Sequence, residues 1–229
     1  MALYALGDLH LSLNSNKSME IFGDGWQDYV SRLKEAFSAL RPEDVTVLCG
    51  DLSWGMSLEE SLEDFRFIDA LPGKKYLLKG NHDYWWNTAA KMERFFREHE
   101  LTTMEILHNN CKFYGELALC GTRGWFYELD NQGTHNEKVL LREIGRLESS
   151  LKAAGEHEKL VFLHYPPLYQ GYRCPEILRL LSAYPVERCC YGHLHGYAIK
   201  RRLEGGWNGT DFSLISADYL GFVPKKICE

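Results

Sequence analysis

The segment Ala2-Leu-Tyr-Ala-Leu-Gly7-Asp8-Leu-His10 joins a short apolar run to two side chains of types that commonly bind metal ions. The run Ala2–Leu6 predicts a buried β-strand, and Gly7 permits a sharp turn before the polar residues. Four further apolar runs are followed in the same way by aspartate, asparagine or histidine. The residues at the five strand ends are Asp8 and His10, Asp51, Asn81 with His82 and Asp83, His164, and His193 with His195. In four of the five, glycine directly precedes the first polar residue.

Segments with helical periodicity separate most of these strands. Trp26, Leu33 and Phe37 fall at a spacing that predicts an amphipathic helix over 25–40. Similar patterns predict helices over 57–72, 87–99, 140–151 and 175–183. Besides the first strand and short strands within 105–121, strands are expected at 45–49, 76–79, 160–163, 186–191, 197–203 and 212–216. The alternation predicts largely parallel pairing, and the late strands predict an antiparallel portion. We therefore expect an α/β protein, 1–229 forming one domain, with two packed sheets flanked by helices.

The five strand ends are expected to meet at one point. In open α/β sheets, ligands bind outside the carboxyl ends of the strands, and the glycines let other groups approach the backbone there. Residues two apart point to the same side of an extended chain, so Asp8 with His10, and His193 with His195, can each bind one ion as a pair.

The side-chain types at these positions fit divalent metals. Carboxylate, amide oxygen and imidazole suit Mn, Fe, Co or Zn. Seven groups exceed the needs of one tetrahedral site, whereas two ions that share a carboxylate would use them all. The predicted ligands are Asp8, His10, Asp51, Asn81, His164, His193 and His195.

These motifs, taken together, resemble the signature of calcineurin-like metallophosphoesterases. The resemblance implies a four-layer α-β-β-α sandwich. It also implies that Asp51 bridges two ions. One ion would be held by Asp8, His10, Asp51 and His195, and the other by Asn81, His164, His193 and Asp51. The protein serine/threonine phosphatase branch resembles Gly-Asp-x-x-Asp-Arg-Gly, where this chain has Trp54 and Gly55 in place of the second aspartate and the arginine. This departure favours the broader phosphohydrolase and phosphodiesterase branch.

The expected reaction is hydrolysis of a phosphodiester or phosphomonoester bond in a small substrate by a metal-bound hydroxide. His82 is the expected catalytic residue, which would donate a hydrogen bond or proton to the leaving oxygen. Trp54 and Tyr84 could contact the substrate as aromatic side chains, and Arg123 could bind a phosphate. Core packing and a structural salt bridge are the competing interpretations of these three residues.

Composition limits the other functions. The net charge of −6 argues against bulk binding of nucleic acid. Seven cysteines without a C-x-x-C pair suggest a reducing compartment, and the start of the chain lacks a basic leader, so a cytoplasmic protein without a membrane segment is expected. Three alternatives remain open: a nuclease acting on DNA or RNA, a non-catalytic metal-binding scaffold of this fold, and a metal-assisted hydrolase of another bond. The sequence does not indicate an oligomeric state.

Overall fold

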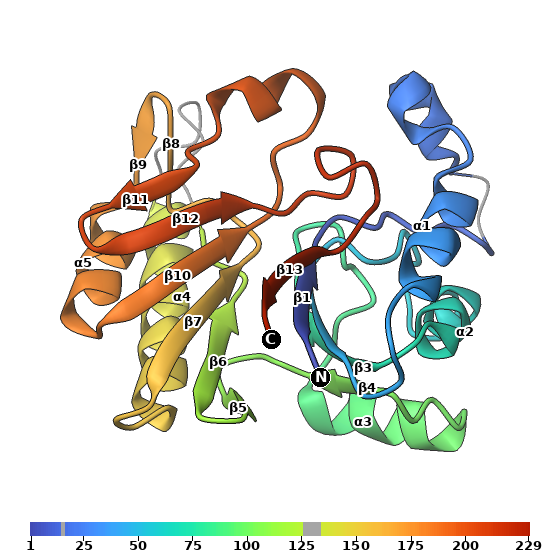
Figure 1. Cartoon of the computed structure of the whole chain (residues 1–229), viewed down its shortest axis with the longest axis horizontal. Helices are drawn as coiled ribbons and strands as arrows, with labels where there is room; N and C mark the ends of the chain where they lie inside the picture. Colours follow the sequence, from blue (N-terminus) through green and yellow to red (C-terminus); the bar gives the residue numbers. More distant parts are fainter. Residues whose placement is uncertain (15–16, 126–133) are drawn as a thin grey trace.

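Two β-sheets pack face to face at the centre of the computed structural model, which describes residues 1–14, 17–125 and 134–229 (Figure 1). The first sheet has the order β13 (Lys225–Cys228), β1 (Leu3–Leu6), β2 (Val45–Cys49), β3 (Lys74–Leu78) and β4 (Met104–Ile106). The second has the order β11 (Gly205–Trp207), β12 (Thr210–Leu214), β10 (Val186–Tyr191), β7 (Glu158–Leu163), β6 (Leu117–Thr122) and β5 (Cys111–Tyr114). Neighbouring strands are parallel except at three edges, where β13, β11 and β5 run antiparallel.

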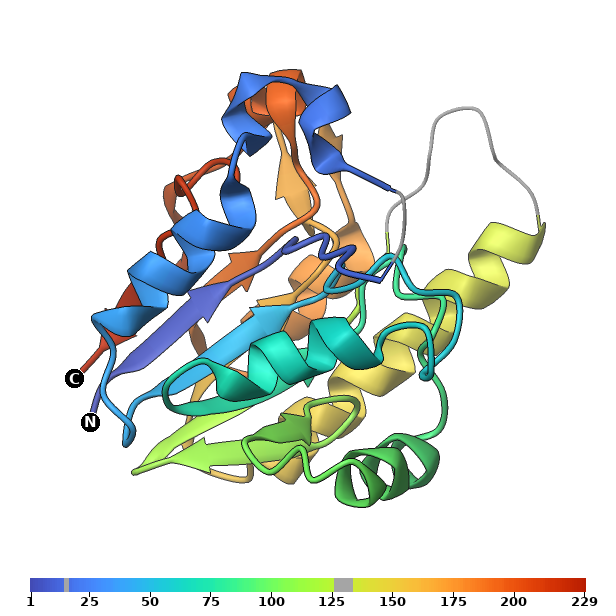
Figure 2. The ribbon, with the colours of Figure 1, turned by 90° about the vertical axis from the view of Figure 1, so that its right-hand side faces the viewer.

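Helices cover the outer face of each sheet, which confirms the expected α-β-β-α layers (Figures 1 and 2). The first sheet carries α1 (Tyr29–Ser38), α2 (Leu62–Ala70) and α3 (Ala89–Glu98), and the second carries α4 (Thr134–Ala153) and α5 (Pro175–Ala183). The short elements are the 3₁₀ helices η1 (Met19–Phe22), η2 (Asp24–Trp26) and η3 (Gly196–Arg201), and the hairpin of β8 (Leu168–Tyr169) and β9 (Tyr172–Arg173). Within the described ranges, none of the helices has the length and apolar character needed to cross a membrane.

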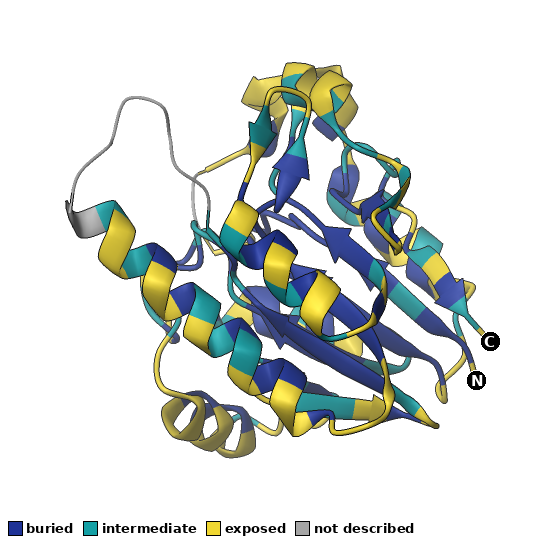
Figure 3. Cartoon of the chain, turned by 90° about the vertical axis from the view of Figure 1, so that its left-hand side faces the viewer, coloured by how far each residue is buried: buried dark blue, intermediate teal, exposed yellow. Residues whose placement is uncertain are grey.

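Successive side chains of a strand point to opposite faces of its sheet, so the two sheets contribute to three apolar layers. In β2, Val47 and Cys49 belong to the core between the sheets, while Leu48 belongs to the core under α1 to α3. A third core lies between the second sheet and α4 and α5. The central strands are therefore buried on both faces, as Figure 3 shows. This packing fixes where each strand ends and so where the polar residues after it lie.

Several expectations about local structure were wrong, among them the start of the helix expected over 57–72, which begins only at Leu62. Residues 197–203 do not form a strand: Gly196 adopts a left-handed conformation at φ 50°, and the chain continues as η3. The place beside β12 is taken by β11, which lies outside the strands expected from the sequence. The helix expected over 25–40 begins only at Tyr29, because the preceding Asp28 is also left-handed, at φ 50°.

Candidate metal centre

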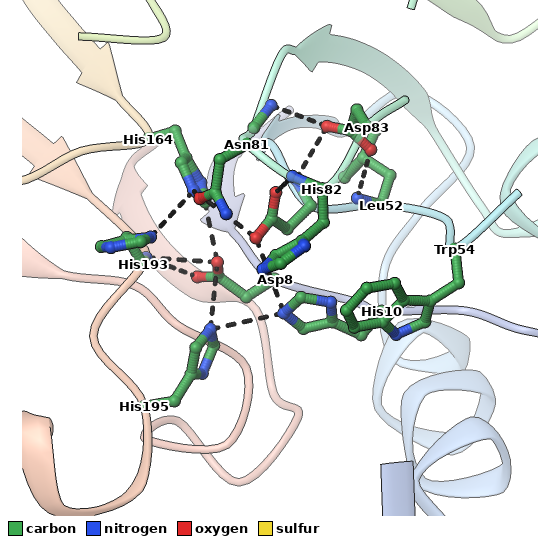
Figure 4. Close-up of polar contacts among 12 residues, drawn as sticks. Asp8, His10, Leu52, Trp54, Asn81, His82, Asp83, His164, His193 and His195 are labelled. Carbon is green, nitrogen blue, oxygen red and sulfur yellow. Dashed lines mark hydrogen bonds and ion pairs between the residues drawn. The ribbon is translucent and has the colours of Figure 1, made fainter. Parts of the chain in front are cut away.

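The five predicted strand ends meet at the carboxyl edge of both sheets (Figure 4). The adjacent strands β1, β2 and β3 carry the first three motifs, and the adjacent strands β7 and β10 of the facing sheet carry the others. Two groups of possible ligands result. The ligand atoms of each group lie within 4.8 Å of one another: Asp8, His10 and His195 in the first, and Asp51, His164 and His193 in the second.

In both groups, ring nitrogens of histidine lie close to other ring nitrogens and to side-chain oxygens. In the first, Nε2 of His195 lies 3.4 Å from Nε2 of His10 and 3.3 Å from Oδ1 of Asp8. In the second, Nε2 of His164 lies 3.2 Å from Nδ1 of His193 and 2.7 Å from Oδ1 of Asn81. Asn81 therefore joins the second group through its amide oxygen.

Asp51 lies between the two groups. Its Oδ2 is 3.7 Å from Nε2 of His10 and 3.5 Å from Nε2 of His164, so this carboxylate faces ligands of both. Four imidazoles that turn ring nitrogens towards one another, with two buried carboxylates among them, form a donor set that suits divalent cations. The residues present thus fit a metal centre with two positions.

The electrostatics of the two carboxylates agree with this fit. Burial disfavours the charge of Asp8, but the neighbouring histidines, His195 first, lower its pKa below the usual range. Burial and then the charge of Asp8 raise the pKa of Asp51 to about 8. Two buried carboxylates that repel each other in this way would be stabilised by bound cations.

The backbone at the ligands adopts strained conformations. Asp8, His10, Asp51 and His193 have φ values of 61°, 46°, 51° and 72°. For residues other than glycine, such conformations cost about 1–3 kcal/mol each and persist only where the surroundings hold them. Here the N–H groups of Asp8 and His10 donate to the carbonyls of Gly50 and Asp51, both at 2.9 Å.

The pairing that strand geometry allowed for His193 and His195 is not found. His193 joins the second group and His195 the first, which is the division that the family resemblance implied. The left-handed conformation of His193 breaks the extended geometry on which that pairing depended. Asp8 and His10 do share a group, although both are left-handed and not extended.

Two glycines next to the ligands are required by close approach. A Cβ on Gly80 would lie 2.0 Å from Oδ1 of Asp51, and a Cβ on Gly192 would lie 2.5 Å from Oδ2 of Asp8. Real Cβ atoms essentially never come within 3.0 Å of another heavy atom in this way. The ligand carboxylates therefore occupy the space that a larger residue would fill.

Asp83 organises the loops that carry ligands. Its carboxylate accepts hydrogen bonds from the backbone N–H groups of Gly80 at 2.6 Å and of Asp51 and Leu52 at 2.8 Å. It also accepts the indole N–H of Trp85 at 3.0 Å. These bonds hold the loops after β2 and β3 together.

The sequence patterns missed Asp218, which accepts a hydrogen bond from Nδ1 of His195 at 3.0 Å. The only sequence signal for it is weak, since Asp218 comes four residues after the apolar strand β12 and no glycine directly precedes it. His164 is oriented differently, because its Nδ1 donates to the carbonyl of Cys49 at 3.1 Å.

The predicted catalytic histidine lies at the rim of the centre. The ring of His82 is 5.8 Å from that of His10 and 4.6 Å from that of Trp54. Its backbone N–H donates to Oδ1 of Asp51 at 2.8 Å, and its Nδ1 is buried with no hydrogen-bond partner among the described residues. Burial, followed by the charge of His164, lowers the pKa of His82. His82 therefore places its ring near His10 of the first group and its backbone N–H on Asp51 of the second, and it belongs to neither group.

The three predicted substrate contacts have different surroundings. Trp54 stacks on His10, with ring centroids 5.1 Å apart, and Tyr84 is 53% exposed next to His82. The guanidinium of Arg123 lies 3.5 Å from Glu143 on α4, and the carbonyl of Arg123 accepts the N–H of His164 at 3.1 Å. This geometry agrees with the interpretation of Arg123 as part of a structural salt bridge, and its role in binding substrate stays a prediction.

A family model of calcineurin-like phosphoesterases matches residues 1–197. The chain belongs to this family. This calcineurin-like phosphoesterase is accordingly a metal-dependent hydrolase of phosphoester bonds, as the sequence motifs predicted. No protein of curated function matches it in sequence.

Two solved structures share the fold of this calcineurin-like phosphoesterase. The phosphopantetheinyl hydrolase from Mycobacterium tuberculosis is 12% identical at a TM-score of 0.61, over 99% of this chain and 95% of that one. A protein of unknown function from Aquifex aeolicus is 15% identical at a TM-score of 0.53, over 98% of this chain and 95% of that one. Both likenesses support the four-layer architecture.

Proposed function

We propose that this chain hydrolyses phosphodiester or phosphomonoester bonds of small substrates with two divalent cations, of Mn, Fe, Zn or Co. The position of Asp51 carries the proposal, because one carboxylate oxygen lies within 3.7 Å of ligand nitrogens from both groups. A carboxylate with two oxygens in such a position suits a site that holds two ions. Asp8, His10 and His195 would complete one position, and Asn81, His164 and His193 the other.

Two cations bound there would lower the pKa of a water molecule and neutralise the charge on the phosphoryl oxygens. The residues of the chain would hold the ions, protonate the leaving group and contact the substrate. The ligands would fix where the two ions lie relative to each other. His82, at the rim, would donate a hydrogen bond or proton to the leaving oxygen, and Trp54 and Tyr84 would contact the part of the substrate beyond it.

Three further features belong to this proposal. We expect the chain to act as one domain, because β13 at its end pairs with β1 at its start. A cytoplasmic location is consistent with the seven cysteines, all of which are free thiols in the structure. A small substrate is preferred to nucleic acid because of the net charge of −6.

The test is to replace His82 by Ala and to measure metal content and turnover together. Turnover is expected to fall by about two orders of magnitude or more with both ions retained, because His82 is not a ligand. Chromogenic monoesters and diesters should be compared with labelled oligonucleotides on the wild type. Unchanged turnover in the variant would remove His82 from the mechanism, and cleavage of oligonucleotides alone would identify a nuclease.

A further inference from the structure

The segment after β12 lies against the metal centre although it falls outside the part of the chain that the family model matches. Gly7 donates its N–H to the carbonyl of Ile215 at 2.8 Å, and Ala217 donates to the carbonyl of Gly7 at 3.0 Å. These two bonds hold the backbone before Asp218 beside the loop that carries Asp8. The position of Asp218 is therefore set by the same strand end that positions a ligand.

Both carboxylate oxygens of Asp218 accept hydrogen bonds, and all three donors belong to His195, Gly196 or Tyr219. Oδ1 accepts from Nδ1 of His195 at 3.0 Å and from the N–H of Tyr219 at 3.0 Å, and Oδ2 accepts from the N–H of Gly196 at 3.1 Å. Its side chain is only 8% exposed. The carboxylate thus holds both the ring of His195 and the backbone that follows it, where the chain turns into η3.

We propose that Asp218 is a positioning residue for the metal centre, which fixes His195 as a ligand of the ion in the group of Asp8 and His10. A proton kept on Nδ1 by Asp218 leaves the lone pair of Nε2 directed at that group, where Nε2 lies 3.3 Å from Asp8 and 3.4 Å from His10. The inference rests on the proposed two-ion function. It assigns to the segment after residue 197 a part in holding one of the two ions.

Loss of Asp218 should affect only one of the two metal positions, because the histidine rings of the two groups are held by different acceptors. His164, in the second group, donates its Nδ1 proton to the neutral carbonyl of Cys49. His195 donates to a carboxylate, which restrains the ring and also makes its other nitrogen a stronger electron donor. Loss of the carboxylate should therefore weaken the ion held with Asp8 and His10 and leave the ion held with Asp51 and His164 bound.

The experiment compares D218A and D218N with the wild type. Each protein is stripped with a chelator and titrated with Mn²⁺ by calorimetry, and the electron paramagnetic resonance spectrum is recorded at two equivalents of Mn²⁺. We expect D218A to lose about 10-fold to 100-fold in affinity at one of two positions and to show the spectrum of an isolated ion. D218N, which keeps one acceptor oxygen, should lose less.

D211N is the matched control, because Asp211 lies in the same C-terminal part, on β12, and pairs with Arg188 instead of a ligand. The unfolding of each stripped variant in urea shows whether the fold is intact, and D218N serves if D218A does not fold. Wild-type affinity at both positions in the Asp218 variants would overturn the inference. A wild type that binds a single ion would contradict the two-ion proposal instead, and the inference would then depend on whether D218A weakens that ion.

Discussion

Replacing Gly192 by alanine is expected to disable the metal centre by displacing Asp8. The new Cβ would lie 2.5 Å from Oδ2 of Asp8, an oxygen that accepts the N–H of His193 at 3.0 Å. Restoring an ordinary contact requires a shift of roughly 0.5–1 Å. Ligand sets must be held to within about 0.5 Å, and a displacement of about 1 Å can cost 100-fold in rate. We expect metal affinity to fall by about 10-fold to 100-fold and turnover by about 100-fold.

Gly7→Ala is the matched control for this prediction. Gly7 also directly precedes a ligand, but its Cβ would meet nothing closer than 3.5 Å, and its φ is not positive. This variant should bind two ions and turn over a chromogenic phosphoester within about threefold of the wild type, since a volume change of one methyl is usually tolerated where space exists. Metal titration and steady-state kinetics on both variants provide the assay. Equal behaviour of Gly192→Ala and the wild type would refute the reasoning.

Two further predictions concern buried carboxylates that support the fold. The carboxylate of Asp44 accepts hydrogen bonds from the N–H groups of Ala2 at 2.7 Å and Arg41 at 2.9 Å. Burial raises the pKa of Asp44, but these hydrogen bonds outweigh it and lower the pKa below 3.8. Asp44→Asn should therefore cost about 1–3 kcal/mol of unfolding free energy at pH 7, and the difference should shrink as pH falls below about 3.8 through the folded-state pKa. Urea unfolding at pH 7, 5 and 3.5 measures this, and a difference independent of pH would contradict it. Asp83→Asn turns an amide towards several N–H donors and should cost about 3 kcal/mol or more in the same assay, together with loss of metal; full metal retention would contradict the role given to Asp83.

The ligand residues were predictable because their signal is local. An apolar strand followed by Asp51, or by His164, needs only the residue types and the rule that parallel strands end at one edge. The layers followed from the same alternation of strands and helices. The division of ligands between two groups was not predictable from strand geometry, because it depends on left-handed backbone at His193, which residue type alone does not reveal.

Other features depend on contacts between distant segments. Gly7 and Gly192 have the same place in the sequence pattern, directly before a ligand. Of the two, Gly192 lies against a carboxylate, that of Asp8, which follows a strand of the other sheet. Asp218 was missed because its role requires the segment after β12 to run beside Gly7. The wrong strand at 197–203 has a similar origin, since Gly196, held by Asp218, turns the chain into η3.

The most direct test of the two-ion centre is anomalous scattering from a crystal loaded with Mn²⁺. Two peaks about 3.5–4 Å apart are predicted, with the carboxylate of Asp51 between them. One peak should lie among Asp8, His10 and His195, and the other among Asn81, His164 and His193. A single peak, or peaks away from these side chains, would contradict the account.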